Sequence, residues 1–273
     1  MQLATLLSLR LAMPSVPRVE AVLLTELVQA KPDLRRIVQQ VNTDPALTLR
    51  LLMAANAPAC KLSRRVHSGS EALAILSLAH AHKLVASAAA AASSRVLAGL
   101  PMPQFWTYSL ECAKVARSVA KLLRLNQQAA YSCGLIHGLG ELLMRAATPE
   151  CVALDAQMPA LALMRDRLEV QQLGFCFTQV TAGLARQGDL PQVIVDALDF
   201  QHAPFDNEAY EPLAGVLHLA IWRARTRQLG LTGNALTVTF PSAVADVLEL
   251  DIDMVLHQDP IDWRAQPAGR LPL

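Results

Sequence analysis

The residues of this chain with the clearest chemical meaning are a histidine and the glycine after it, His137 and Gly138, in the apolar stretch LIHGLGEL. A histidine followed by an aspartate in an apolar helix offers an imidazole and a carboxylate to one metal ion. Here the histidine is present and the carboxylate is missing. Hard cations such as Mg²⁺ require oxygen ligands, so this pair argues against a catalytic metal.

Composition predicts a protein built from helices. Of the 273 residues, 53% are hydrophobic and only 4% are aromatic, so Leu, Ala and Val must form the core. Ala and Leu are strong helix formers, and Ala lets neighbouring helices approach closely. The formal net charge of +1 gives no global attraction to nucleic acid or to an anionic membrane. We therefore expect neither as a partner.

Cysteine usage and hydropathy predict a cytoplasmic protein. The apolar stretch 84–98 contains three serines and Arg95, and it falls short of the roughly 20 apolar residues that a membrane span needs. Residues 1–13 lack the features of a signal peptide. The cysteines are widely spaced and form no CxxC, which predicts free thiols in a reducing compartment: Cys60, Cys112, Cys133, Cys151 and Cys176.

Apolar residues recur with helical spacing along almost the whole chain. Asp33, Asp44 before Pro45, and Ser68 three residues before Glu71 are helix start signals. The longer predicted helices cover residues 18–30, 104–125, 127–147, 160–173, 177–187, 191–202 and 207–229. The run ALTVTF at 235–240 predicts a short extended piece, and Pro241-Ser242 begins a last predicted helix.

These segments predict a single compact all-α domain of two lobes that share a core. A Pro-rich hinge at 101–103 separates the lobes but is too short to divide independent domains. Within a domain spanning 11–255, the predicted parts are an N-terminal lobe at 14–103, a second lobe at 104–230 and a helical extension at 231–255. The tail at 258–273, with three prolines, is predicted to be a loose arm.

The order of these segments resembles the bacterial HDOD family, the HD-related output domain, over about residues 11–250. The first lobe supplies MPSVPRVEAVLL, DPALTLRLLMAAN and SEALAIL, and the second supplies FWTYSLECAKVA, GLIHGLGELLM and a late LG…LP…His pattern. The resemblance implies an all-helical fold whose second lobe is similar to the HD metal-dependent phosphohydrolases.

The resemblance also indicates where the metal ligands of an HD phosphohydrolase would lie. The first histidine is replaced by Tyr108, the His-Asp pair by His137-Gly138, the next histidine by Phe177, a His-His pair by Gln201-His202, and the final aspartate by Ile221. A divalent cation is not held by fewer than about three protein ligands. We therefore expect no bound metal, no cofactor and no catalytic residue at these vestigial positions.

Two features of this region have simpler structural interpretations. His137 is predicted to be a buried histidine bonded to backbone or to a hydroxyl. Gly134, Gly138 and Gly140 are predicted to lie in one helix, where they allow a neighbouring helix to approach closely. Elsewhere, His80 and His82 are about 200° apart around a helix and cannot chelate one ion.

The leading functional hypothesis is a non-enzymatic signalling scaffold that docks regulatory proteins. The resemblance implies cyclic-dinucleotide enzymes or two-component regulators as partners, and an Ala-rich helix pair would allow a homodimer. One alternative is a residual phosphohydrolase or phosphodiesterase that uses His137 and His202. The other is a nucleotide or metabolite sensor whose cavity is lined by Tyr108, Phe177 and Ile221.

Overall fold

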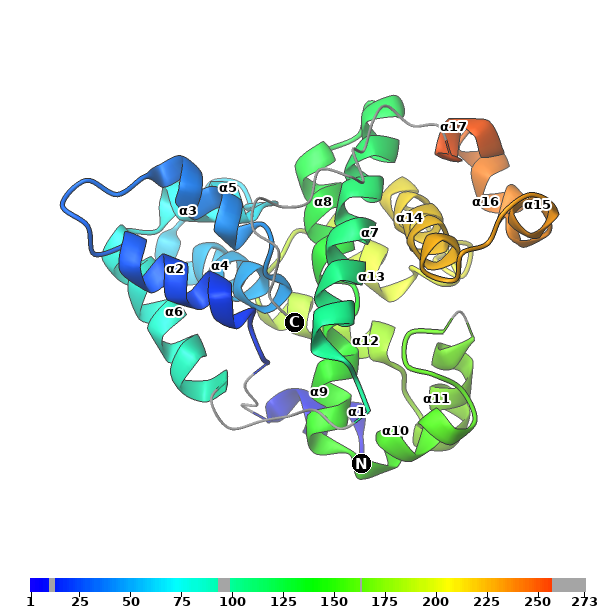
Figure 1. Ribbon diagram of the computed structural model, residues 1–273, viewed down its shortest axis with the longest axis horizontal. Helices are drawn as coiled ribbons and strands as arrows, with labels where there is room; N and C mark the ends of the chain where they lie inside the picture. Colours follow the sequence, from blue (N-terminus) through cyan, green and yellow to red (C-terminus); the bar gives the residue numbers. More distant parts are fainter. Residues whose placement is uncertain (10–12, 93–98, 163, 257–273) are drawn as a thin grey trace.

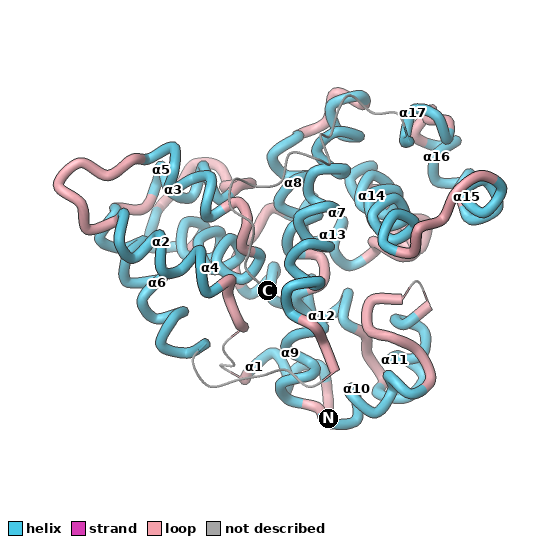
Figure 2. The backbone as a smooth tube through the Cα atoms, viewed as in Figure 1, coloured by secondary structure: helices cyan, strands magenta, loops and turns pink. Residues whose placement is uncertain are grey.

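The protein is all-helical, as predicted (Figures 1 and 2). The computed structural model describes residues 1–9, 13–92, 99–162 and 164–256, and no strand occurs in these ranges. The predicted C-terminal arm at 258–273 lies outside them. No helix in the described ranges is both long enough and apolar enough to cross a membrane.

The first lobe is a group of helices whose start signals act as predicted. The Asp33 carboxylate accepts hydrogen bonds from the backbone N–H groups of Arg35 and Arg36, and the Ser68 hydroxyl accepts one from Glu71 N at 3.2 Å. These bonds satisfy backbone donors that a helix N-terminus otherwise leaves unpaired. The lobe contains α2 (Pro17–Glu26), α3 (Leu34–Val41), α4 (Pro45–Asn56), η1 (Pro58–Cys60), α5 (Gly69–Ile75) and α6 (Leu78–Ala92).

The second lobe is built around a long pair of packed helices, α7 (Met102–Leu122) and α8 (Gln127–Ile136), with α14 (Pro212–Gln228) against α7. A single core cluster of buried apolar side chains includes residues of both lobes. The remaining helices of this lobe are α9 (Leu139–Ala147), α10 (Pro149–Ala153), η2 (Leu154–Ala156), α11 (Arg165–Leu173), α12 (Phe177–Gln187) and α13 (Gln192–Asp199).

The two ends of the described chain both pack on the second lobe. The N-terminal α1 (Leu3–Ser8) lies beside α9 and α12 rather than with the first lobe, and its Leu6 is fully buried (Figure 1). At the other end, α15 (Asn234–Thr239), α16 (Ser242–Val247) and α17 (Ile252–Leu256) continue beyond α14.

The extended piece predicted at 235–240 is wrong, because these residues form α15. A lone extended segment would have no neighbouring strand among the described residues to satisfy its backbone. In the helix, the Thr239 hydroxyl donates to Ala235 O at 2.7 Å and accepts from Trp222 Nε1 at 3.2 Å. The Phe240 ring, just after the helix, packs edge-on against Trp222.

The single helix predicted at 127–147 is also wrong. The segment forms two helices, α8 and α9, which are interrupted at His137 and Gly138. Gly134 therefore lies in α8 and Gly140 in α9. At Gly140 the predicted close approach is real, because an added Cβ would collide with the Phe177 carbonyl and lie 2.7 Å from Thr181 Oγ1.

Other boundaries differ from their predictions by several residues. The helix predicted at 160–173 begins only at Arg165, and the one predicted from 207 begins at Pro212. The helix predicted at 18–30 ends at Glu26, and the one predicted at 191–202 ends at Asp199. The prediction for 177–187 matches α12.

Candidate functional site

His137 and Gly138, two of the positions that the resemblance assigns to metal ligands, lie at the break between α8 and α9. Side chains from α12 and from the segment after α13 stabilise this break. The carbonyl of His137 accepts hydrogen bonds from Thr181 Oγ1 at 3.2 Å and from Gln201 Nε2 at 3.3 Å. The Glu141 N–H bonds instead to Gly138 O at 3.1 Å. The bond that would join the two helices is therefore replaced by side-chain donors.

His137 is buried, as the sequence predicts, and its ring has defined partners. Its Nδ1 lies 2.7 Å from Gly134 O, and since a carbonyl only accepts, the ring proton is on Nδ1. The Tyr108 ring meets the imidazole edge-on, with centroids 5.3 Å apart. Burial lowers the pKa of His137 to about 4, with a further contribution from His202, whereas the Gly134 bond opposes the shift. The ring is therefore neutral at physiological pH.

A side chain at position 138 would begin against hydrocarbon. A Cβ built on Gly138 would lie 3.1 Å from Phe105 Cε2 and 3.4 Å from Leu161 Cδ2. Both of these side chains are buried. An aspartate here would thus meet an aromatic ring and an aliphatic chain, and burying a carboxylate among such groups is costly.

The remaining vestigial positions form a second group beside His137. The Phe177 ring lies edge-on to His202, with centroids 5.4 Å apart, and His202 Nδ1 is 3.3 Å from Asp166 Oδ1. Gln201 links the two groups, because its side chain donates to His137 O and its carbonyl accepts from His218 Nδ1 at 2.8 Å.

Sequence reasoning missed two members of this group, Asp166 and His218. The sequence signal for His218 is the segment HLA, in which this histidine stands three residues before Ile221. The prediction used this segment only to locate the aspartate position that Ile221 occupies. Ile221 itself is buried on α14. Asp166 comes from α11, whose start at Arg165 gave no motif to follow.

The donors around His137 do not fit the metal that the HD resemblance implies. Three histidines and Asp166 lie in this region, yet within the described ranges no three of their ligand atoms come within 4.8 Å of one another. The carboxylate position is Gly138, packed against hydrocarbon. A divalent cation needs several ligands converging on one point, and this arrangement does not supply them.

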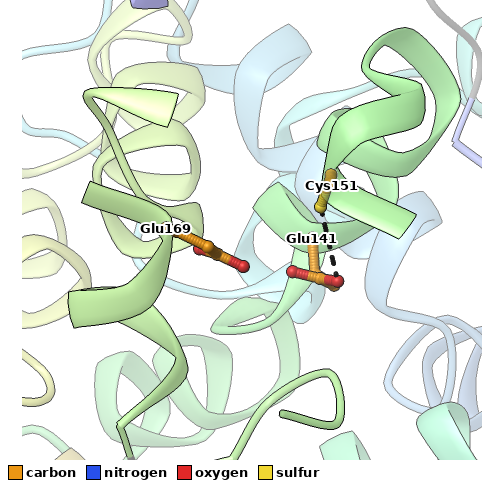
Figure 3. Close-up of side chains that lie close together, drawn as sticks. All are labelled: Glu141, Cys151 and Glu169. Atoms are coloured by element: carbon orange, nitrogen blue, oxygen red, sulfur yellow. Dashed lines mark hydrogen bonds between the residues drawn. The ribbon is translucent and has the colours of Figure 1, made fainter. Parts of the chain in front are cut away.

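A different cluster in the same lobe does bring potential ligands together. Glu141, Cys151 and Glu169 are all buried, and each offers one atom within 4.8 Å of the others. Figure 3 shows the two carboxylates facing one another, with the Cys151 thiol directed toward Glu141. By ligand spacing alone, this is the strongest metal-site candidate of the described chain.

The cation that satisfies this cluster is an arginine of the chain itself. Fully buried Arg165 contacts all three groups: its Nε is 2.8 Å from Glu169 Oε1, and its Nη2 is 3.9 Å from Glu141 Oε1 and 3.8 Å from Cys151 Sγ. Arg145 adds a second guanidinium, with Nε 2.6 Å from Glu141 Oε1. A metal ion here would be repelled by both arginines, so we interpret the cluster as a structural ionic network.

The charges of this network balance when one proton is retained. Its acidic members are Glu141, Glu169 and Asp155. The Oδ1 atom of Asp155 lies 2.5 Å from Arg145 Nη2 and 3.2 Å from Arg165 Nη1. Three carboxylates face two guanidiniums. Burial, and then the neighbouring Glu141 carboxylate, raise the pKa of Glu169 above its usual range. A proton held by Glu169 therefore makes the network neutral.

Comparison with known proteins identifies the family. The sequence matches the HDOD domain over residues 13–204, which is well over half of the chain. The chain belongs to the HDOD domain family. A curated relative, an uncharacterized protein of Treponema pallidum (strain Nichols), is 28% identical over 192 residues. That match covers 67% of this chain and 36% of the relative, so the chain spans about a third of that protein's length.

Solved structures show the same HDOD architecture. The MmoQ response regulator from Methylococcus capsulatus str. Bath aligns with a TM-score of 0.72 at 22% identity, over 91% of this chain and 98% of that one. An HDOD domain protein of unknown function from Geobacter sulfurreducens aligns with a TM-score of 0.50 at 21% identity, over 90% and 88%. At these identities the likeness establishes the fold.

The buried neutral His137 predicts acid sensitivity in this HDOD domain. Its pKa of about 4 lies below the ordinary value of 6.5, so the unfolded chain takes up a proton first as the pH falls. The stabilisation is complete above pH 6.5 and is lost as the pH falls toward 4. Between pH 7 and pH 5 we expect His137 to account for a loss of about 2 kcal/mol in the free energy of unfolding.

Urea unfolding of wild type and His137→Asn at several pH values measures this contribution by difference. The raised pKa of Glu169 acts in the opposite sense, because its stabilisation is lost as the pH rises. This contribution is common to both proteins and cancels when their free energies of unfolding are subtracted. His80→Asn is the control, because His80 is exposed and should leave the pH profile unchanged. Parallel profiles for wild type and His137→Asn would contradict the prediction.

Proposed function

We propose that this HDOD domain is a non-catalytic signalling module that works by docking another regulatory protein. The observation that carries the proposal is the packing at Gly138, where a side chain would begin against the hydrocarbon of Phe105 and Leu161 and no carboxylate is present. Without that ligand, too few donors remain beside His137 to hold a cation that would activate water and neutralise phosphate. What this lobe offers instead is a rigid helical surface.

Membership of the HDOD family and the kinds of protein that share the fold support a signalling role. The Methylococcus capsulatus neighbour is a response regulator, and another neighbour, from Marinobacter aquaeolei VT8, is described as a signal transduction protein. We propose two-component regulators or cyclic-dinucleotide enzymes as the docked partners. The match to only part of the Treponema pallidum relative is compatible with a module that works alongside other domains.

Residual hydrolysis is the competing function, and the pairing of His202 with Asp166 is the feature that favours it. A histidine beside a carboxylate can act as a general base. It would, however, have to act without the metal that stabilises the phosphate charge. The expected rate with phosphomonoesters and cyclic dinucleotides is therefore the background rate.

Metal content and hydrolysis should be measured on one preparation of the full chain. We expect less than stoichiometric Mn, Fe or Zn, and equal background rates for wild type, His137→Ala and His202→Ala. About one metal ion per chain, or a rate that either variant abolishes, would overturn the non-catalytic assignment. Affinity capture from native lysate tests the docking role, with enrichment of signalling proteins expected and no retained protein contradicting it.

A further inference from the structure

A cavity of about 270 Å³ opens beside the vestigial site. Its walls come from the first turns of α7, the loop before α11 and the C-terminal turns of α14. Its volume is close to the lower end, about 300 Å³, of pockets that bind small organic ligands. Of the residues predicted to line a ligand cavity, Tyr108 does so, whereas Phe177 and Ile221 do not line this one.

The lining is mainly apolar, with two amides and a single charged side chain. Phe105 and Tyr108 contribute aromatic rings, and Pro159 and Leu161 contribute aliphatic surface. The charged lining residue is Arg225, and within the described part of the chain its guanidinium has no hydrogen bond or ion pair. Arg225 is half-buried, and none of its nitrogens is sealed from water. An anionic group that entered the cavity would give this guanidinium a charged partner.

Leu161 connects this cavity to the vestigial site. The residue adopts a left-handed backbone conformation with φ of +58°, which is unfavourable for a leucine. Its side chain covers Gly138 on one side and lines the cavity on the other. The hydrocarbon that excludes a metal ligand at position 138 therefore also forms part of the wall of the pocket.

The geometry points to a binding site for a small organic carboxylate that carries one flat apolar ring. A single planar guanidinium matches a carboxylate through two parallel hydrogen bonds. A phosphate dianion would favour a second cation, and among the described residues the lining contains no other charged side chain. The aromatic rings and Leu161 would contact the apolar ring of the ligand, and the Gln104 and Gln228 amides lie beside them. This inference goes beyond the proposed docking function and does not depend on it.

Phenylacetate is a suitable probe, with phenylacetamide as its neutral analogue and phenyl phosphate as its phosphate analogue. Backbone amide shifts of the full chain should be followed while each probe is titrated. We expect saturable shifts with phenylacetate at residues 104–108 and 225–229. Binding of phenylacetamide and of phenyl phosphate should be at least tenfold weaker.

Two variants and one matched control locate the site. Arg225→Gln should weaken phenylacetate binding at least tenfold, and Ala160→Trp should abolish it by filling the cavity while Arg225 remains. Arg223→Gln is the control, because Arg223 is on the same helix and outside the lining, and it should bind like wild type. The melting temperature of each variant confirms that it is folded.

Several outcomes would overturn the assignment. These are the absence of saturable shifts at the lining residues with phenylacetate, equal binding of phenylacetamide, or tighter binding of phenyl phosphate. Unchanged affinity in folded Arg225→Gln or in folded Ala160→Trp would do the same. The docking proposal survives each of these results, because no step of it uses this cavity.

Discussion

Replacing Arg165 by methionine is expected to lower the free energy of unfolding by about 3–5 kcal/mol, the range for removing one partner from a buried ion pair. The variant leaves the carboxylates of Glu141 and Asp155 with only Arg145 to balance them, because Glu169 holds a proton. It also removes the hydrogen bond from Arg165 Nη2 to Cys151 O at 2.6 Å. Such a loss is a large fraction of the usual total stability of a domain.

Thermal and urea unfolding of Arg165→Met measure this effect. For a chain of this size the loss corresponds to a fall in Tm on the order of 10 °C. The matched control is Arg167→Met, the same substitution two residues along α11 at an exposed position. Its stability should stay within about 0.5 kcal/mol of wild type, and an equal loss in both variants would show that the network is not the cause.

A double variant separates charge from packing. Arg165→Met combined with Glu141→Gln removes a guanidinium and an ionised carboxylate together. Arg145 then faces Asp155 and the protonated Glu169, so the buried charges balance. We expect it to be more stable than Arg165→Met alone, because uncompensated charge and not the loss of the pair dominates the cost. A double variant that is less stable than the single one would contradict this interpretation.

The ionic network was hidden in the sequence for a physical reason. Glu141 with Arg145 and Arg165 with Glu169 both have the i,i+4 spacing of ordinary surface ion pairs on helices. Only the packing of α9, α10 and α11 buries them against one another. Spacing along one helix identifies the partners, but burial depends on contacts between elements, which no local pattern encodes.

The same distinction between local and distant causes explains the rest of the fold. Helix α12 was predicted with its correct ends because its apolar spacing is local. The break at His137 was not, because Thr181 and Gln201 stabilise it from 44 and 64 residues away. The vestigial positions were found through the family resemblance, whereas Asp166 joins them only through the tertiary placement of α11.

His137 contributes to the packing of the second lobe through both its ring and its carbonyl. His137 is buried and neutral, and its Nδ1 proton is donated to Gly134 O. Its carbonyl is the point where side chains of α12 and of the segment after α13 meet the α8–α9 break. The groups around His137 therefore stabilise the packing of this lobe.

The second large effect is expected at Asp44, which caps α4 from a fully buried position. Its carboxylate accepts a hydrogen bond from Leu47 N at 2.8 Å, which caps α4, and another from Val16 N at 2.6 Å. The second bond attaches the start of α2 to the start of α4. Asp44→Ala removes the cap, worth about 1 kcal/mol, and leaves a buried Val16 N–H unsatisfied, costing about 1–3 kcal/mol more.

We therefore expect Asp44→Ala to lose about 2–4 kcal/mol in urea unfolding. The measurement belongs at pH 7.5, because burial raises the pKa of Asp44 to about 6 and the carboxylate is ionised above that value. Asp33→Ala is the matched control: Asp33 caps α3 from an exposed position, without a bond to a distant segment, and its loss should not exceed about 1 kcal/mol. Equal losses in the two variants would mean that the bond to Val16 contributes nothing, and that the first lobe is stabilised by its apolar contacts alone.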